Sequence, residues 1–260
     1  MMFKRLRIAI LLYILAFIAL GNFLAAARST DWDETLWVDV YPINADGSAR
    51  AQAYVDGLSS ADFSRIEAYF SGQAQRYGVT LEKPFRLELG PQVESDMPEL
   101  APTPSMLDTL IWSLKMRWFA ARIDSGSGRP SPDIKLFALY YEHSEETVLD
   151  RSTALERGLI AVAKLYAGRS SQGTNQVVMA HELLHTLGAT DKYDLDTNLP
   201  IYPDGYANPT LQPLYPQRSA ELMAGRIPLD ERTADMPSSI SRTVVGPLTA
   251  AEIGWPIAEP

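Results

Sequence analysis

The chain has 260 residues, of which 46% are hydrophobic and 21% charged, the composition of an ordinary globular protein. This length suffices for one substantial domain. The sequence contains no cysteine, which excludes disulfide frameworks and thiolate metal sites, so a transition-metal site would have to use imidazole, carboxylate and water. The net charge of −9 repels phosphates and no basic stripe offsets it, so we expect no nucleic-acid partner.

Three basic residues among the first seven precede an uncharged run at residues 8–27. The three alanines that end this run suit the cleavage site of a signal peptide. A run of about 20 apolar residues is also long enough for an uncleaved membrane anchor. Basic residues stay on the cytoplasmic side, so both alternatives export the chain that follows. We therefore predict a signal peptide or N-terminal membrane anchor at residues 1–27, with membrane contact through residues 8–27 if they are uncleaved.

The first predicted elements alternate between strand and helix. Residues 35–43 are rich in aromatic and β-branched side chains and favour a strand. A helix is expected at about 59–77, with serine at its start and Gly78 as its stop. A short strand is expected at 85–89, and the segment 90–104 holds four prolines, which indicates a surface loop.

Ser105 is predicted to cap a second helix at 107–123, whose apolar residues recur at helical spacing. These residues are Leu107, Leu110, Ile111, Leu114, Trp118 and Ala121. Strands are expected at 134–141 and 159–166, joined by a charged connection at 142–156.

A third helix is predicted from about Thr174 to Gly188, after which the chain is rich in proline, asparagine and aspartate up to Pro216. Late helical or turn elements are expected at 219–224 and 249–254. This alternation predicts an α+β fold in which helices pack on a mixed, mostly parallel sheet, followed by an irregular C-terminal subdomain. No boundary divides residues 28–260, which we expect to form one domain.

His181 and His185 lie four residues apart on the third predicted helix, so their side chains project from one face. One zinc ion can take both imidazole nitrogens at about 2.0–2.1 Å. Glu182 lies about 100° around the helix axis, too far to be a third ligand on that face. It can instead take a proton from a water activated by the metal during attack on a carbonyl. The pattern predicts two zinc ligands and a general base.

The phase of this helix supports a site rather than a core position for the histidines. Val177, Ala180, Leu184 and Leu187 share a neighbouring face that would bury the helix against the sheet. The histidines would then face a cleft. The structural alternative is a pair of histidines on an ordinary amphipathic helix.

The sequence offers three candidates for the third ligand. Gly188 follows His185 by three residues, and glycine ends helices readily because it accepts positive φ. A sharp turn there would bring Asp191 back toward the metal as the third ligand. Glu221 is the main rival, since other zinc peptidases use a distant glutamate, and His143 in a charged loop is a remote third option.

The string HELLHTLGATD, from His181 to Asp191, resembles the extended motif of the metzincin peptidases, His-Glu-x-x-His-x-x-Gly-x-x followed by His or Asp. The aspartate form is similar to that of snapalysin, and the continuation to Asp194 is similar to the immune inhibitor A family of bacterial secreted peptidases. The resemblance is dense over residues 177–194. It implies a metzincin-like fold with a methionine-bearing turn beneath the metal, for which Met223 is the better match and Met236 the weaker one.

Stabilisation of the developing oxyanion needs a hydrogen-bond donor near the metal. Tyr193, Tyr206 and Tyr215 lie in the irregular segment that should border the cleft, and Tyr193 is closest to the ligands in sequence.

The sequence therefore predicts an exported zinc metallopeptidase with one Zn²⁺ per chain, acting on a protein or peptide substrate in the periplasm, at the cell surface or in secreted form. A catalytically silent cell-surface binding protein stabilised by zinc is an alternative, as is a tethered binding module without a metal. An amidase that acts on a non-protein amide would carry the same motif.

Overall fold

The computed structural model describes Arg7, Tyr13 and residues 29–94, 97–99, 105–123, 131–143, 153–155 and 159–257. The predicted signal peptide or anchor lies outside the described residues, apart from Arg7 and Tyr13, and so do parts of the predicted proline-rich loop. Within the described ranges, no helix has both the length and the apolar character needed to cross a membrane.

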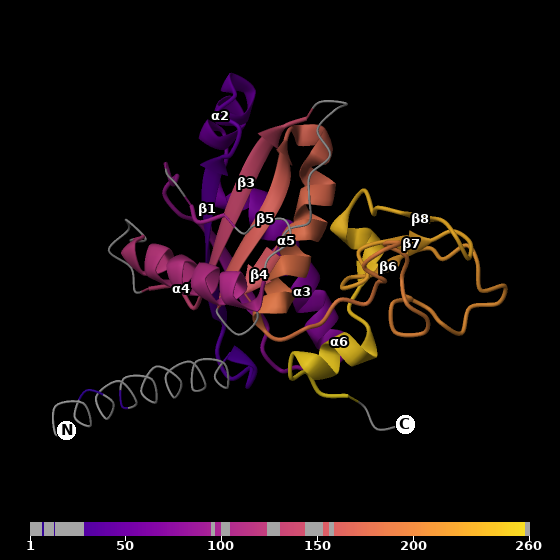
Figure 1. The fold of residues 1–260 in the computed structure, drawn as a ribbon. Coiled ribbons are helices and arrows are strands. Elements are labelled where there is room, and N and C mark those ends of the chain that lie inside the picture. The colour runs from indigo at the N-terminus through magenta and orange to yellow at the C-terminus, as the bar shows by residue number, and fades with distance from the viewer. Residues whose placement is uncertain are drawn as a thin grey trace.

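A five-stranded sheet forms the centre of the fold, in the order β2-β1-β3-β5-β4 (Figure 1). Its strands are β1 (Leu36–Asn44), β2 (Phe85–Leu89), β3 (Ile134–Glu142), β4 (Thr153–Leu155) and β5 (Ile160–Ala167). All neighbouring strands in it are parallel except β4, which pairs antiparallel with β5 at one edge. The predicted α+β class with a mixed, mostly parallel sheet is confirmed.

Helices cover both faces of this sheet. One face packs against α2 (Ala49–Asp56), α3 (Ser64–Arg76) and α5 (Gln172–Thr186), and the other packs against α4 (Met106–Arg122). Short 3-10 turns, η1 (Ser60–Phe63) and η2 (Arg169–Ser171), lead into α3 and α5. In β1, Val38 and Val40 belong to the first core whereas Tyr41 and Ile43 belong to the second, because successive strand side chains point to opposite faces.

Before α5, one helix and one strand were not predicted from the sequence. The first is α2, which begins after Ser48, whose side chain accepts a hydrogen bond from the Ala51 amide at 3.1 Å and so caps the helix. The second is β4, a three-residue strand within the segment predicted as a charged connection. The third predicted helix, α5, begins at Gln172 rather than Thr174 because η2 leads directly into it.

The buried side of α4 is not the stripe whose spacing predicted the helix. Trp112, Met116 and Ala120 pack into the core, and the Trp112 indole donates to the Pro98 carbonyl at 2.8 Å. The large residues of the predicted stripe remain exposed on the opposite side of the helix. Their exposed fractions are 63% for Leu107, 57% for Leu110, 42% for Ile111, 60% for Leu114 and 64% for Trp118.

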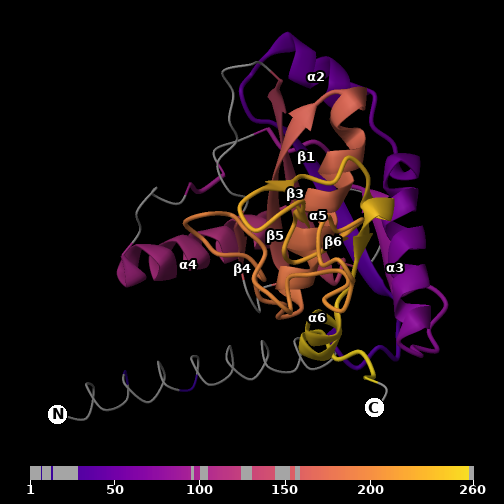
Figure 2. The same ribbon diagram turned by 90° about the vertical axis from the view of Figure 1, so that its right-hand side faces the viewer.

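The chain after α5 is largely irregular, as predicted. It lies against the side of α5 that faces away from the sheet (Figure 2). Its short elements are β6 (Ala220–Glu221), β7 (Ile227–Pro228), β8 (Ala234–Asp235), η3 (Ile240–Arg242), β9 (Thr243–Val244) and α6 (Pro247–Glu252). Two small two-stranded sheets, β6-β9 and β7-β8, connect parts of this region. The helical or turn element expected at 219–224 is a two-residue strand followed by a turn.

Candidate metal centre

The helix α5 presents its two histidines on a side that does not pack into the core. Val177, Ala180 and Leu184 are buried against the sheet, as their spacing predicted. The side chains of His181 and His185 keep 12% and 13% of their surface exposed. Because they lie one helical turn apart, their rings meet, with centroids 4.6 Å from each other.

Gly188 turns the chain back at the end of α5. Its φ of +99° lies in the region that glycine adopts without a Cβ clash. The amide of Gly188 donates to the His185 carbonyl at 3.1 Å, and the amide of Ala189 donates to the Leu184 carbonyl at 3.1 Å, which closes the helix end. The turn returns Asp191 to the histidines, as the glycine spacing predicted.

A hydrogen-bonded network to α6 fixes both chain neighbours of Asp191. The ammonium of Lys192, a buried side chain, donates to Glu252 Oε2 at 2.7 Å and to the Thr190 carbonyl at 2.8 Å. The amide and hydroxyl of Thr190 donate to the two Glu252 oxygens at 3.0 and 2.7 Å. Burial raises the pKa of Glu252, but its bonds with Lys192 and Thr190 outweigh that effect and lower the pKa below its usual value. The carboxylate is therefore held charged, which keeps the network intact at neutral pH.

Three potential ligand atoms converge at one point. His181 Nε2 and His185 Nε2 are 3.0 Å apart, and Asp191 Oδ1 lies 3.1 Å from each of them. Within the described part of the chain, this is the one group of three metal-ligating side chains so arranged. The three atoms form a nearly equilateral triangle.

The tautomers of the two histidines follow from their outer partners. His181 Nδ1 lies 3.0 Å from the Leu222 carbonyl, and His185 Nδ1 lies 2.8 Å from the Ala189 carbonyl. A carbonyl oxygen only accepts, so both Nδ1 atoms must donate. In the neutral imidazoles both Nε2 atoms then carry lone pairs that point toward the Asp191 oxygen.

Three lone-pair atoms at such distances repel one another unless a cation lies between them or an imidazole takes up a proton. Burial alone lowers the pKa of His181, but the bond with Asp191 and the charge of Glu182 outweigh it and raise the pKa to about 9. A metal ion that binds here must displace that proton.

The triangle fits a tetrahedral metal ion. Ligands at about 2.0–2.1 Å from such an ion lie about 3.3 Å apart, close to the observed separations. Two imidazole nitrogens and one carboxylate oxygen suit a divalent transition metal. Asp191 Oδ1 is buried, and apart from its ion-pair contacts with the two Nε2 atoms it has no hydrogen-bond partner among the described residues. Three protein ligands leave a fourth position open, as in catalytic rather than structural sites.

Glu182 lies between the two ligand histidines in sequence and is buried, with 4% of its surface exposed. Burial raises the pKa of its carboxyl group above the usual value, although His181 and His185 lower it. Its Oε2 atom has no hydrogen-bond partner within the described ranges. Such a buried oxygen costs about 1–3 kcal/mol unless water or another group satisfies it. The site therefore includes a buried carboxylate oxygen whose hydrogen-bonding capacity the described residues do not use.

The two rival ligands are not brought to this cluster. Glu221 is fully buried, and its carboxylate accepts hydrogen bonds from the amides of Ala224 and Gly246 and from the Thr249 hydroxyl, at 2.8–3.0 Å. His143 instead stacks edge-on against Tyr166, with ring centroids 4.6 Å apart. The fold thus places Asp191 beside the histidines and gives Glu221 a structural role.

The turn that carries Met223 contacts the first histidine of the cluster. Met223 is fully buried in the larger core. The preceding carbonyl, of Leu222, bonds to His181, and the carbonyl of Met223 accepts from the Lys192 amide at 3.0 Å. One short turn therefore contacts both the first histidine and the loop that carries Asp191.

The three tyrosines of the irregular segment lie differently from one another. The ring of Tyr193 lies near His181, with centroids 6.4 Å apart. Tyr206 and Tyr215 pair their hydroxyl groups at 2.7 Å. Of the three, Tyr193 is the one whose ring pairs with a histidine of the cluster.

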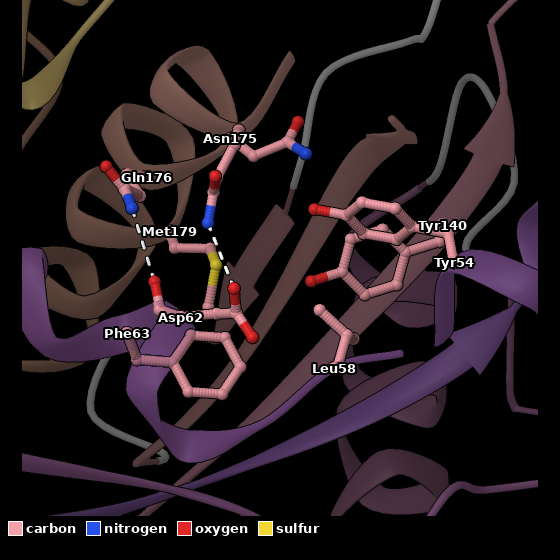
Figure 3. A pocket seen from close by; sticks show the side chains of 9 residues that line it. Tyr54, Leu58, Asp62, Phe63, Tyr140, Asn175, Gln176 and Met179 are labelled. Atoms are coloured by element: carbon pink, nitrogen blue, oxygen red, sulfur yellow. Dashed lines mark hydrogen bonds between the residues drawn. The ribbon is translucent and has the colours of Figure 1, made fainter. Parts of the chain in front are cut away.

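A small pocket lies at the N-terminal part of α5, away from the histidines (Figure 3). Its volume of about 10 Å³ is roughly what one water molecule requires. Gln172 donates to the Asp62 carboxylate at 3.1 Å, and Gln176 donates to the Asp62 carbonyl at 3.2 Å. The pocket lies between η1 and α5 and is too small for a substrate.

We expect Gly205→Ala to lower the free energy of unfolding by about 1–3 kcal/mol. A Cβ at this position would clash with the Lys192 carbonyl and would lie 2.7 Å from the Ile201 amide nitrogen. Both are main-chain atoms, so the residue next to Asp191 would have to move. Urea unfolding measures the change. Gly72→Ala is the matched control, because a Cβ there meets nothing within 4 Å, and equal effects of the two substitutions would contradict this close approach.

The sequence alone did not reveal the residues that support the site. Lys192 and Glu252 are 60 positions apart, and His181 and Leu222 are 41 apart. No spacing rule links such positions, and the Leu222 contact uses a main-chain atom that leaves no compositional signal. The burial of Lys192, which is unusual for a lysine and points to a partner, is visible only in the structure.

The comparisons with known proteins leave the functional argument to this geometry. No protein-family model matches the sequence, and no curated protein matches it.

Proposed function

We propose that the protein is a metzincin-like zinc peptidase that acts outside the cytoplasm. The observation that carries the proposal is the convergence of His181 Nε2, His185 Nε2 and Asp191 Oδ1 within 3.1 Å of one another. Beside them stands Glu182, with a buried oxygen that lacks a partner among the described residues. Three ligands, an open position and an adjacent carboxylate are what metal-assisted amide hydrolysis requires.

Several residues of the chain have separate roles in the proposed hydrolysis. Zinc in this site would supply Lewis acidity and a bound water with a pKa near 7. The Leu222 and Ala189 carbonyls fix the tautomer and orientation of the two histidines. Glu182 takes a proton from the attacking water and passes it to the leaving amine nitrogen as the C–N bond breaks.

Two further residues have proposed roles at the same site. Tyr193 would donate to the developing oxyanion, a role supported by the position of its ring beside that of His181. Met223 would form the methionine turn that the metzincin resemblance implies, and its burial beneath His181 supports that role.

A peptide substrate is favoured by the surface that follows Asp191. Leu195, Ile201 and Tyr202 expose half or more of their side chains in this segment. Exposed apolar side chains in the segment that follows a polar site can contact the side chains of a peptide. A catalytically silent zinc protein would have no use for the buried, partnerless oxygen of Glu182, which disfavours that alternative.

The proposal is tested with the full chain, loaded with zinc and incubated with a mixed peptide library whose products are identified by mass spectrometry. We expect cleavage that a chelator abolishes and added zinc restores. Bound zinc without cleavage of any peptide would support the silent binding protein. Cleavage of cell-wall amides alone would move the protein to the amidase class.

A further inference from the structure

The outer face of α4 is apolar although it points away from the protein. Successive helical residues rotate by about 100°, so Leu107, Leu114 and Trp118 lie on the side of α4 opposite Trp112 and Met116. Leu110 and Ile111 extend this exposed stripe, and Met106 at its start is 93% exposed. We call these six residues the α4 stripe: Met106, Leu107, Leu110, Ile111, Leu114 and Trp118. A contiguous apolar surface of this size marks an interaction site rather than chance exposure.

Basic side chains border the α4 stripe on both sides. By the same rotation, Arg117 lies at one edge, and Lys115 and Arg122 lie at the other. The Arg122 guanidinium stands 4.4 Å from the centre of the Trp118 ring. The one acidic residue of α4 is Asp108, which is occupied in the capping box with Ser105. The helix therefore carries positive charge in a chain whose net charge is −9.

This pattern matches an interfacial helix. Such helices bury an apolar face in a bilayer surface while lysine and arginine reach the headgroups, and tryptophan sits at the headgroup level. A second copy of the chain fits less well, because a symmetric pairing through α4 would bring the bordering cations of the two copies together. The uncharged run at residues 8–27, if it is retained as the anchor that is one of its two predicted roles, holds the chain at a membrane, which supplies the surface.

We propose that α4 docks the domain onto an anionic phospholipid bilayer through the α4 stripe, with Lys115, Arg117 and Arg122 contacting the headgroups. The metal centre is on α5, which packs on the other face of the sheet, so docking leaves the cluster uncovered. The contact does not depend on zinc or on catalysis.

The absence of cysteine makes a direct test straightforward. Leu114→Cys in the full chain carries an environment-sensitive fluorophore, and the protein is reconstituted into vesicles of phosphatidylcholine and phosphatidylglycerol. We expect quenching by spin-labelled lipid and a several-fold lower quenching constant for aqueous iodide. Arg65→Cys is the control, since Arg65 is exposed on α3, on the other face of the sheet, and its label should remain open to iodide.

The charge requirement is tested in the same system. Vesicles without phosphatidylglycerol should show less lipid quenching. A variant that carries Lys115→Gln, Arg117→Gln and Arg122→Gln should show the same decrease, because each basic residue contributes about a fivefold factor to binding at an anionic surface. Equal iodide access at positions 114 and 65 in anionic vesicles would overturn the proposal. Iodide protection at 114 that appears without lipid and grows with protein concentration would assign the stripe to a second copy and would also overturn it.

Discussion

Glu182→Gln is expected to lower kcat for peptide hydrolysis by about 10²–10⁴-fold while zinc stays bound. The amide has the shape of the carboxylate, so the buried position remains filled and the fold is preserved. It cannot take a proton from water, which removes the general base. Glu182 is not one of the three converging ligands, so the metal content should not change.

The rate is measured on the best peptide from the library, and zinc is measured on the same samples. Glu82→Gln, an exposed glutamate in the loop before β2, is the matched control and should keep the wild-type rate. A Glu182→Gln protein that holds zinc and cleaves at the wild-type rate would show that another group moves the proton.

Glu221→Ala is expected to lower the free energy of unfolding by about 3–5 kcal/mol. The carboxylate is fully buried and accepts from Ala224, Gly246 and Thr249. Removing it leaves these buried donors unpaired and opens a cavity. Burial raises the pKa of Glu221, although these hydrogen bonds lower it.

Chemical unfolding measures the loss, and zinc content shows whether the residue is also a ligand. Glu221→Gln keeps an acceptor oxygen and should lose less stability than the alanine variant. Both variants, where folded, should keep one zinc per chain. Loss of zinc from a folded Glu221→Gln protein would contradict the structural role assigned here.

Much of the sheet was predictable because its strands are buried on both sides. The β-branched and aromatic runs at 35–43, 134–141 and 159–166 each correspond to a central strand, within a residue at either end. The edge strand β4 was missed because three residues next to a long partner need little sequence signal of their own. The helix α2 was missed because it is short and only Ala51 and Val55 in it are buried, which leaves little apolar periodicity in the sequence.

The helix α4 shows a limit of periodicity. Its apolar residues surround the helix, so spacing predicted a helix at the right place but did not say which face the sheet would cover. Trp112 and Met116 face the sheet, and Leu114 and Trp118 do not. The choice depends on the side chains of β1, β3 and β5 that α4 meets, which lie far away in sequence.

In the candidate site, local geometry was predictable and distant support was not. The four-residue spacing of the histidines and the glycine after them correctly predicted the turn that returns Asp191. The choice between Asp191 and Glu221 needed the fold, because it depends on how the segment after α5 packs. The same holds for Glu252, which reaches the Asp191 loop from α6.

The most direct measurement of the central claim is zinc content by elemental analysis, on the wild type, Asp191→Ala and Asp194→Ala. Asp194 is an exposed aspartate three residues beyond the third proposed ligand, and its carboxylate accepts from the Thr197 amide at 2.8 Å, so it controls for the loss of a nearby charge. We predict one zinc per chain in the wild type and in Asp194→Ala, and its loss from Asp191→Ala. A wild type that takes up no zinc even after supplementation, or an Asp191→Ala protein that keeps it in full, would contradict the proposed site.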